Sequence, residues 1–336
     1  MGEVIDPVIV AVDGGGTKTD IAICALDGTL VTRSRLGTFA PHLVGLAQTV
    51  KYLDAAVGNL LAGAGRPPVA AAAVCFCDID FPFEAEDFRA GLAEHSWAGQ
   101  KLFSDNDMFA LLRTGTDEAT AVAVVCGTGT NCVGRSADGR VVRFAAIGDV
   151  SGDWGGGAGL GQAAIWHSAR AADGRGPATA LEPLLVRALG RDSMDEVILG
   201  FHVGELSYSD IPQLVPLIFE AASTGDEVAN MLIDRQADEI VALATAALRR
   251  LDVLGRPCPV VLGGGVIAAR HACLLEAIDQ KLARQAPLAR PVIISEPPII
   301  GAACLAFDLL GAGKDVFTAV RHSLGQLPAT TVAVAP

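Results

Sequence analysis

VIVAVDGGGTKTDIAICALDG, residues 8–28, is the segment on which the architecture of this chain depends. Val8–Asp13 is apolar except for its last residue and has the length of a buried central strand. Gly14-Gly15-Gly16 then lets the backbone turn with its N–H groups exposed, and amides that converge on one point attract an anion. Residues 21–26 predict a returning strand that ends in the hairpin turn Asp27-Gly28. This glycine turn therefore joins two strands and predicts a phosphate site.

The residues that follow the first glycine turn add donors for a phosphate. Thr17 and Thr19 supply two hydroxyl groups, and Lys18 supplies a positive charge. The alternative for Lys18 is a solvated turn residue without a ligand. The turn is not a Walker A loop, because no Gly-x-x-x-x-Gly-Lys-Ser/Thr occurs in the chain.

The same order of parts occurs again about a hundred residues later. AVAVVCGTGTNCVGRSADG, residues 121–139, contains an apolar strand, the turn Gly127-Thr128-Gly129-Thr130-Asn131, a short strand and the hairpin Asp138-Gly139. A single turn of this kind has a plain alternative, which is a tight hairpin without a ligand. Two matched copies favour duplicated domains that share one ligand.

Length and composition allow two domains and exclude some partners. A chain of 336 residues is too long for one ordinary core, and 51% of it is hydrophobic, so each domain has core material. The formal charge of −13 argues against nucleic acid and anionic membranes, both of which attract basic surfaces. Any phosphate must be held locally, by amides, Lys18 and a metal ion.

Cysteine usage and the N-terminus predict an intracellular protein. The eight cysteines form no Cys-x-x-Cys and most fall in apolar segments, which is typical of reduced core thiols in the cytoplasm. Glu3 and Asp6 occupy the place where a signal peptide carries basic residues, and no apolar run reaches about 18 residues. We expect a cytoplasmic protein without a membrane segment.

Periodicity along the chain predicts where the domains divide. The first domain reads as three antiparallel strands followed by alternating helices and parallel strands, and residues 115–118 form a short polar hinge. The second domain begins with the same three strands. The expected divisions are 1–116, 117–305 with a helical insertion, 306–327 as C-terminal helices that can pack back on the first domain, and 328–336 as a tail.

Several motifs together resemble a known family. VDGGGTKTD, CGTGTNC, GDWGGG, VLGGGV and EPPIIGAA are similar to the N-acetylglucosamine kinase branch of the BadF/BadG/BcrA/BcrD ATPase family, over residues 8–308. This family belongs to the sugar kinase, heat-shock ATPase and actin superfamily. The resemblance implies an α/β fold of two ribonuclease-H-like (actin-like ATPase) domains with a nucleotide cleft between them. It also implies an ATP-dependent kinase that phosphorylates the 6-hydroxyl of N-acetylglucosamine or a related amino sugar.

The resemblance, together with the chemistry of phosphoryl transfer, assigns roles to the motif residues. Asp107 matches the family's position for the catalytic base beside the acceptor hydroxyl, with Asp105 as its rival, and Asn106 is expected to hold a sugar hydroxyl. The alternative for either aspartate is a cap on the following helix. Asp13 is expected to hold Mg²⁺ through water. The ATP phosphates are assigned to Gly14, Gly15, Gly16, Thr17, Lys18, Gly127, Thr128 and Gly129.

Further residues are assigned to adenosine and the sugar. Gly263, Gly264 and Gly265 are expected to approach adenosine. A competing interpretation of Gly263-x-Gly265-x-x-Ala268 is a dinucleotide fingerprint. Asp153 resembles the family's aspartate near the sugar and metal, with a helix cap as the alternative. The other expected sugar contacts are Thr130, Asn131 and His42, with Trp154 as a possible lining residue of the pocket.

Two segments depart from the family pattern. Pro41-His42 stands in a loop where the kinase branch usually carries an asparagine, and Cys75-Phe76-Cys77-Asp78 is bulkier than the small residues common there. These differences predict a smaller pocket or a different sugar. The sequence does not choose among N-acetylglucosamine, glucosamine and related sugars.

Other functions stay open at this point. An ATPase activator of an acyl-CoA reductase or dehydratase shares the fold but needs paired cysteines for an iron–sulfur cluster between subunits, and a sensor that has lost catalysis is a third possibility. The expected partners are an amino sugar, ATP and a second copy of the chain in a homodimer.

Overall fold

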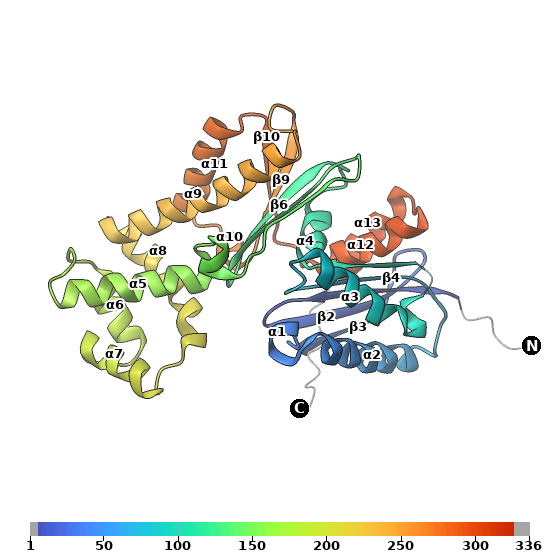
Figure 1. Cartoon of the computed structure of the whole chain (residues 1–336), viewed down its shortest axis with the longest axis horizontal. Coiled ribbons are helices and arrows are strands. Elements are labelled where there is room, and N and C mark those ends of the chain that lie inside the picture. The colour runs from blue at the N-terminus through green and yellow to red at the C-terminus, as the bar shows by residue number, and fades with distance from the viewer. Residues whose placement is uncertain (1–5, 100, 326–336) are drawn as a thin grey trace, which may run out of the picture. The chain divides into compact units, whose positions relative to one another are not determined.

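The computed structural model describes residues 6–99 and 101–325, and their contacts divide the chain into two units (Figure 1). The first unit contains the chain up to Ala123 and from Ile294 onward, and the second contains Val124–Ile293. A five-stranded sheet forms the centre of each unit. The α/β class predicted from the sequence is therefore confirmed.

The first sheet has the strand order β3-β2-β1-β4-β5. Strands β1 and β2 pair antiparallel, as do β2 and β3, whereas β4 pairs parallel with both β1 and β5. This is the predicted pattern of three antiparallel strands followed by parallel ones. The strands are β1 (Val8–Gly14), β2 (Lys18–Ala25), β3 (Leu30–Gly37), β4 (Val69–Phe76) and β5 (Leu102–Asn106).

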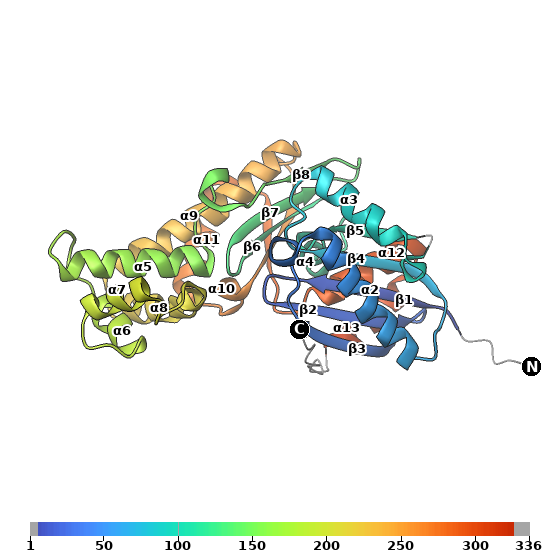
Figure 2. The ribbon, with the colours of Figure 1, turned by 60° about the horizontal axis from the view of Figure 1, so that its bottom comes forward.

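Helices cover both faces of the first sheet, as Figure 2 shows. Val10 and Val12 of β1 share one core cluster with Leu53 of α2 (Leu46–Gly63) and Phe88 of α3 (Pro82–Ala93). The opposite face packs against α12 (Ile299–Leu310), which contacts β1 and β4. Since side chains alternate along a strand, the nearly continuous apolar runs of β1 and β4 supply both cores. The remaining elements of this unit are α1 (Pro41–Val44), η1 (Ser96–Ala98), α4 (Met108–Gly115) and α13 (Lys314–Gly325).

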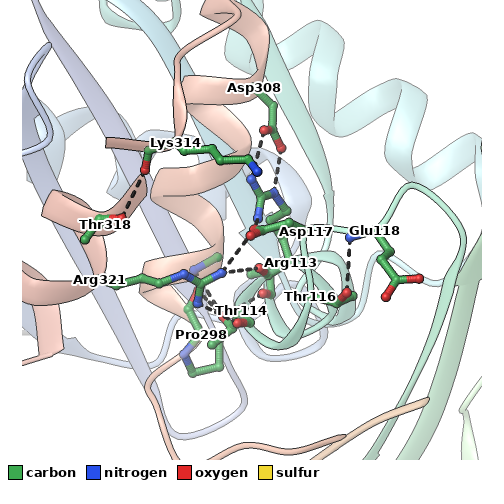
Figure 3. Close-up of polar contacts among 12 residues, drawn as sticks. Arg113, Thr114, Thr116, Asp117, Glu118, Pro298, Asp308, Lys314, Thr318 and Arg321 are labelled. Carbon is green, nitrogen blue, oxygen red and sulfur yellow. Dashed lines mark hydrogen bonds and ion pairs between the residues drawn. The ribbon is translucent and has the colours of Figure 1, made fainter. Parts of the chain in front are cut away.

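A polar network joins the end of α4 to the C-terminal helices (Figure 3). The buried guanidinium of Arg113 donates from Nε to one oxygen of Asp308 (2.8 Å) and from Nη2 to the other (3.1 Å), and it also pairs with Asp117. Arg321 of α13 donates to the carbonyl oxygen of Thr114 at 2.7 Å. The chain therefore returns to the first unit at Ile294, before the boundary at 306 that the sequence predicts.

The second sheet repeats the first. Its strand order is β10-β9-β6-β7-β8. If β6 to β10 are matched in turn with β1 to β5, this order corresponds to β5-β4-β1-β2-β3, which is the first sheet read from its other edge. This match supports the duplication inferred from the two glycine turns. The strands are β6 (Ala121–Cys126), β7 (Thr130–Arg135), β8 (Val141–Arg143), β9 (Cys258–Gly263) and β10 (Ala289–Ile293).

Helices make up most of the rest of the second unit. The longest is α9 (Glu227–Arg250), whose N-cap Asp226 accepts a hydrogen bond from the amide of Ala229 at 2.8 Å. The predicted helical insertion contains α6 to α8. The other helices are η2 (Gly148–Ser151), α5 (Gly156–Ala172), α6 (Leu181–Ala188), α7 (Met194–Val203), η3 (Tyr208–Leu214), α8 (Val215–Ser223), α10 (Gly265–Ala268) and α11 (Ala272–Gln285).

Two further expectations concern the chain as a whole. Within residues 6–99 and 101–325, no helix is both long enough and apolar enough to span a bilayer. The predicted tail, 328–336, lies outside the described residues.

Candidate active site

The parallel strands β1, β4 and β5 end at one edge of the first sheet, and polar residues follow each of them. The register aligns Gly14, Phe76 and Asn106 in one row across the three strands. The next amides continue this ladder, because Cys77 donates to the carbonyl of Gly14 at 2.7 Å and Asp107 donates to that of Phe76 at 3.1 Å. The structure therefore places Asp107 two strands away from the first glycine turn, at the same edge of the sheet.

The carboxyl group of Asp107 resists ionisation. Burial raises the pKa of Asp107 to about 8, and the negative charges of Asp13, Asp80 and Asp78 add to this effect. Asp107 lies at the N-cap position of α4, but its side chain accepts no capping hydrogen bond. The side chain therefore does not form the usual N-cap bond, and a hydrogen bond from the amide of Met108 offsets part of the rise in its pKa.

Asn106 holds the segment that carries Asp107. Its amide nitrogen Nδ2 donates to Oδ1 of Asp80 at 2.9 Å, and its Oδ1 accepts from the amide of Met108 at 3.0 Å. Asn106 is almost fully buried, so these bonds fix the strand end to the β4–α3 loop. The predicted contact with a sugar hydroxyl would require a second hydrogen bond at one of these two atoms.

The first glycine turn presents two backbone amides for which the described residues offer no hydrogen-bond acceptor. The amide of Gly15 closes the turn by donating to the carbonyl of Lys18 at 2.8 Å, and the hydroxyl of Thr38 donates to the carbonyl of Gly15 at 2.8 Å. Among the described residues, the amides of Gly16 and Thr17 donate no hydrogen bond. Two adjacent free amides in a turn form a concave site for an anion such as a phosphate.

Three cations of β2 and β3 surround the buried carboxylate of Asp20. Arg35 binds Asp20 with both ends of its guanidinium, from Nε to Oδ1 at 2.9 Å and from Nη2 to Oδ2 at 2.8 Å, and Arg33 and Lys18 lie at 3.3 and 3.5 Å from the carboxylate. Burial opposes the ionisation of Asp20, but the three cations keep its pKa below the ordinary value. The ammonium of Lys18 therefore pairs with Asp20 in addition to its predicted role toward phosphate.

Asp13 is chemically suited to a metal ion. It is buried at the end of β1, and burial followed by the charge of Asp20 raises its pKa to about 7. Within the described part of the chain, its side chain makes no hydrogen bond or ion pair. A hard divalent cation prefers carboxylate oxygen, directly or through water. Its positive charge would balance the negative charge of the Asp13 carboxylate. The donor fits the Mg²⁺ that the sequence predicts at this position.

His42 contacts Asp78, a residue to which the sequence assigned no role in the site. His42 lies in α1, its ring Nδ1 contacts the carboxylate of Asp78, and its amide donates to Asp78 Oδ2 at 3.3 Å. Asp78 and Asp80 both follow β4 and contact site residues, His42 and Asn106. Their position directly after an apolar strand was the available signal, since polar residues at the carboxyl ends of parallel strands gather at one edge.

The bulky aromatic residue at the end of β4, Phe76, packs into the core. Phe76 is fully buried and packs against Phe39 and Phe88. Its ring fills the space beside Gly14, where an added Cβ would lie 2.1 Å from the ring. Phe76 therefore explains why β1 ends in glycine. Its ring fills the core, whereas the sequence predicted that the bulk of this segment would narrow the sugar pocket or change the sugar.

The second glycine turn is built into the start of α5. The amides of Gly157 and Ala158 donate to the carbonyls of Gly127 (2.7 Å) and Thr128 (2.8 Å). Gly156 has a φ of +66°, and a Cβ there would lie 2.6 Å from the backbone of Gly129. The helix consequently begins at Gly156, inside the GDWGGG motif.

This turn also retains free donors. The amide of Gly127 donates to the carbonyl of Gly129 at 2.9 Å, whereas the amides of Thr128 and Gly129 have no hydrogen-bond acceptor among the described residues. The second unit thus offers two amides to an anion, as the first unit does with Gly16 and Thr17.

The third glycine turn lies against the second. Gly264 has a φ of +92°, and a Cβ on it would come within 2.4 Å of the carbonyl oxygen of Cys126 and 2.7 Å of the amide nitrogen of Gly127. The predicted adenosine turn, Gly263 to Gly265, is therefore adjacent to a predicted phosphate turn. The packing of Gly264 on the second glycine turn favours the adenosine turn over the dinucleotide fingerprint, and the sheet departs from an all-parallel one because β7 and β8 pair antiparallel.

A cavity of about 750 Å³ in the second unit is lined by some of the residues predicted for the sugar, namely Thr130, Asp153 and Trp154, and by Gly129, predicted for phosphate. Asn106 and His42 do not line it. The hydroxyl of Thr130 donates to the carbonyl of Trp154 at 3.1 Å, which ties the second glycine turn to the Trp154 segment. Asn131 is not part of this lining, and its Oδ1 accepts from the amide of Cys132 at 2.6 Å.

Asp153 braces its own loop. Its Oδ2 accepts from the amide of Gly148 at 3.2 Å and contacts the hydroxyl of Ser151. The N-cap of α5 is Gly155, so Asp153 does not cap this helix. Asp153 therefore holds its own turn together without capping a helix, and it also belongs to the cavity lining.

Two residues of α9 belong to this region and were missed in the sequence. Gln236 is fully buried, and its Oε1 accepts from the amide of Gly156 at 2.8 Å. The Cζ of Arg235 lies 3.9 Å from the ring centroid of Trp154. Gln236 could have been noticed, because it interrupts the apolar positions Leu232 and Ile240 at helical spacing.

The cysteines do not form a metal site. Cys273 alone is exposed, Cys77 is partly exposed and the other six are buried. Burial raises the pKa of Cys24 and of Cys126 to about 12, which disfavours the thiolate needed for metal binding. An activator with an iron–sulfur cluster between subunits would need an exposed pair, which these eight residues do not supply.

Sequence comparisons connect this geometry with known proteins. The N-acetyl-D-glucosamine kinase of Dictyostelium discoideum is 26% identical over 317 residues, covering 90% of this chain and 98% of that protein. The N-acetylmuramic acid/N-acetylglucosamine kinase of Clostridium acetobutylicum is 24% identical over 261 residues, covering 77% and 85% of the two chains.

Solved structures establish the fold. A candidate N-acetylglucosamine kinase from Chromobacterium violaceum superposes with a TM-score of 0.67 at 23% identity, covering 90% of this chain and 99% of that one. A ROK family glucokinase from Streptomyces griseus gives 0.52 at 19% identity with the same coverage. These similarities confirm the predicted actin-like ATPase fold of two ribonuclease-H-like domains. The sequence model of the BadF/BadG/BcrA/BcrD ATPase family matches residues 10–306, and the chain belongs to that family.

Proposed function

We propose that this protein is an ATP-dependent kinase that transfers the γ-phosphate of MgATP to the 6-hydroxyl of N-acetylglucosamine or a related amino sugar. The observation that carries the proposal is the carboxyl group of Asp107, which has a raised pKa and does not form the usual N-cap bond. The names of the two curated relatives support the amino-sugar acceptor.

Asp107 acts as the general base in this proposal. A carboxylate with a pKa of about 8 accepts a proton more readily than one at the ordinary value of 3.8. Asp107 takes the proton of the sugar hydroxyl while the hydroxyl oxygen forms a bond to the γ-phosphorus and the bond to the β-phosphate oxygen breaks, so that ADP leaves. Asn106 and Asp80 position Asp107 through the hydrogen bonds that fix the end of β5.

Backbone amides hold the triphosphate in this proposal. Gly16 and Thr17 of the first turn and Thr128 and Gly129 of the second offer free N–H groups to phosphate oxygens. Gly263 to Gly265 approach the adenosine. Asp13 would hold Mg²⁺, which supplies positive charge beside the phosphates when it is bound.

The sugar contacts proposed in the second unit are Thr130 and Asp153, which line its cavity. In the first unit the proposed sugar contact is His42, which is held by Asp78. A homodimer and a cytoplasmic location stay predictions of the sequence.

Substitution of Asp107 tests the proposed base. We expect Asp107→Asn to retain ATP binding and to slow phosphoryl transfer by about 10²–10⁴-fold, because an amide cannot accept the proton. The measurement is ADP release in a coupled assay against a panel of N-acetylglucosamine, glucosamine and glucose, with ATP binding followed by calorimetry. Asp105→Asn is the matched control, since it makes the same chemical change two residues earlier.

The pH dependence supplies a second readout of the same variants. Because the base works only when ionised, kcat/KM of the wild type should rise with pH until the pH approaches the pKa of Asp107. The residual activity of Asp107→Asn should lack this rise. Full activity in Asp107→Asn, or a loss confined to Asp105→Asn, would assign the base to another residue.

A further inference from the structure

Gln236 is a buried polar residue on an apolar face of α9. It is fully buried, and its helical neighbours Leu232 and Ile240 are apolar and buried as well. Its Oε1 accepts from the amide of Gly156 at 2.8 Å, whereas its Nε2 has no hydrogen-bond acceptor among the described residues. A buried donor without an acceptor costs free energy, so an apolar side chain of the same length would suit the core better. Packing alone therefore does not account for glutamine at this position.

The bond from Gly156 to Gln236 completes the N-terminus of α5. The first amides of a helix have no acceptor within the helix, and the N-cap residue here, Gly155, has no side chain to supply one. Gln236 accepts from the first of these amides, and two carbonyls of the second glycine turn accept from the next two. The start of α5 is therefore bonded to α9 on one side and to the second glycine turn on the other.

Close backbone contacts connect Gln236 with the free amides of that turn. A Cβ on Gly155 would lie 2.2 Å from Oε1 of Gln236, and a Cβ on Gly156 would lie 2.6 Å from the backbone of Gly129. The side chain of Gln236 and the three glycines are thus packed one against the next. The amide of Gly129 is one of the two donors of the turn without an acceptor among the described residues. Because packed interiors transmit displacements, the place of the Gln236 side chain fixes the place of this proposed phosphate donor.

We propose that Gln236 is a positioning residue that holds the second glycine turn in the geometry that binds the nucleotide phosphates. This inference rests on the kinase function proposed above, which assigns the amides of Thr128 and Gly129 to ATP. Without the acceptor on Gln236, the amide of Gly156 is left unpaired, the start of α5 shifts, and the turn shifts with it. Residues 263–265, proposed for adenosine, keep their own strand and helix. Phosphate binding therefore weakens more than adenosine binding.

Two substitutions separate the acceptor from the bulk of the side chain. Gln236→Met keeps the length but removes the acceptor, and we expect Kd to rise about 5–30-fold for ATP and less than about 2-fold for adenosine. Gln236→Glu keeps an oxygen at the same distance from α9. At pH 6 burial holds this carboxyl group neutral, so Kd for ATP should stay within about 3-fold of the wild type. Gln280→Met makes the first change at an exposed glutamine of α11 and should affect the binding of neither ligand.

Calorimetry of the intact protein at pH 6 separates this inference from the kinase proposal. It measures nucleotide binding without phosphoryl transfer, so a selective loss of ATP affinity in Gln236→Met supports the positioning role even if no amino sugar is phosphorylated. Equal losses for ATP and adenosine would make Gln236 a merely structural residue, and unchanged ATP binding would show that the turn needs no support from α9. Should Gln236→Met not fold, Gln236→Glu decides alone, because weakened ATP binding in that variant overturns the role of the acceptor.

Discussion

The protonation state of Asp107 affects both the proposed catalysis and the stability of the folded protein. In the unfolded chain its carboxyl group titrates near 3.8, whereas in the folded protein burial and neighbouring aspartates raise the pKa to about 8. Between these values the folded protein holds a proton that the unfolded chain has released. The free energy of unfolding therefore falls as the pH rises from about 4 to about 8, and the loss is complete above that pH.

Asparagine at position 107 should stabilise the protein while removing the base. Asp107→Asn eliminates the buried negative charge, so we expect a gain of about 1 kcal/mol at pH 8.5, or roughly 2–4 °C in Tm, and a smaller gain at pH 5. The measurement is thermal unfolding without nucleotide and with a chelator, with Asp105→Asn as the control. A variant that is less stable than the wild type at pH 8.5, or equally shifted at both pH values, would contradict the burial of this charge.

Single residues differ in how well the sequence predicts them. Asp107 and the glycine turns could be found because each belongs to a local motif. Asp78, Asp80 and Arg235 could not be assigned in this way, because their partners His42, Asn106 and Trp154 lie 26 to 81 residues away along the chain. The packing of loops that follow different strands determines which of these residues contact each other.

The helix α12 depends on a glycine for its contact with α4. A Cβ on Gly301 would lie 1.9 Å from the carbonyl oxygen of Ala110 and 2.6 Å from the hydroxyl of Thr114, which itself accepts a hydrogen bond from the amide of Gly301 at 3.0 Å. The two helices therefore meet backbone to backbone. By contrast, Gly58 in α2 has no atom within 4 Å of the position of its Cβ.

The same substitution in the two helices should have opposite effects. Gly301→Ala forces α12 away from α4, and we expect it to destabilise the protein by about 2–3 kcal/mol. Gly58→Ala adds helix propensity in open space, and we expect a gain of about 0.5–1 kcal/mol. Urea unfolding at equilibrium measures both. Equal effects of the two substitutions would show that α12 does not pack as closely as described.

Element types were predicted better than element boundaries. The strands of β1 to β3 follow directly from apolar runs and hairpin turns. The start of α5 at Gly156 could not be predicted, because glycines are poor helix formers and this first turn is stabilised by the carbonyls of Gly127 and Thr128. Residues 41–63 form two helices in place of one, because the chain breaks at Gly45 between α1 and α2.

On the scale of the whole molecule, the duplication is visible in the sequence and the path of the chain is not. The two glycine turns predict two related sheets, and both sheets have the same strand order. The return of the chain to the first unit depends on contacts such as Arg113 with Asp308, which are 195 residues apart and belong to no motif.

Product identification by ³¹P NMR tests the central proposal most directly. The protein is incubated with ATP, Mg²⁺ and N-acetylglucosamine, in parallel with Asp107→Asn. We predict that the wild type converts the γ-phosphate signal into ADP and a phosphomonoester coupled to the two protons on carbon 6 of the sugar, and that the variant forms this product about 10²–10⁴ times more slowly. Release of inorganic phosphate alone, a phosphoester at another hydroxyl, or an unchanged rate in the variant would contradict it.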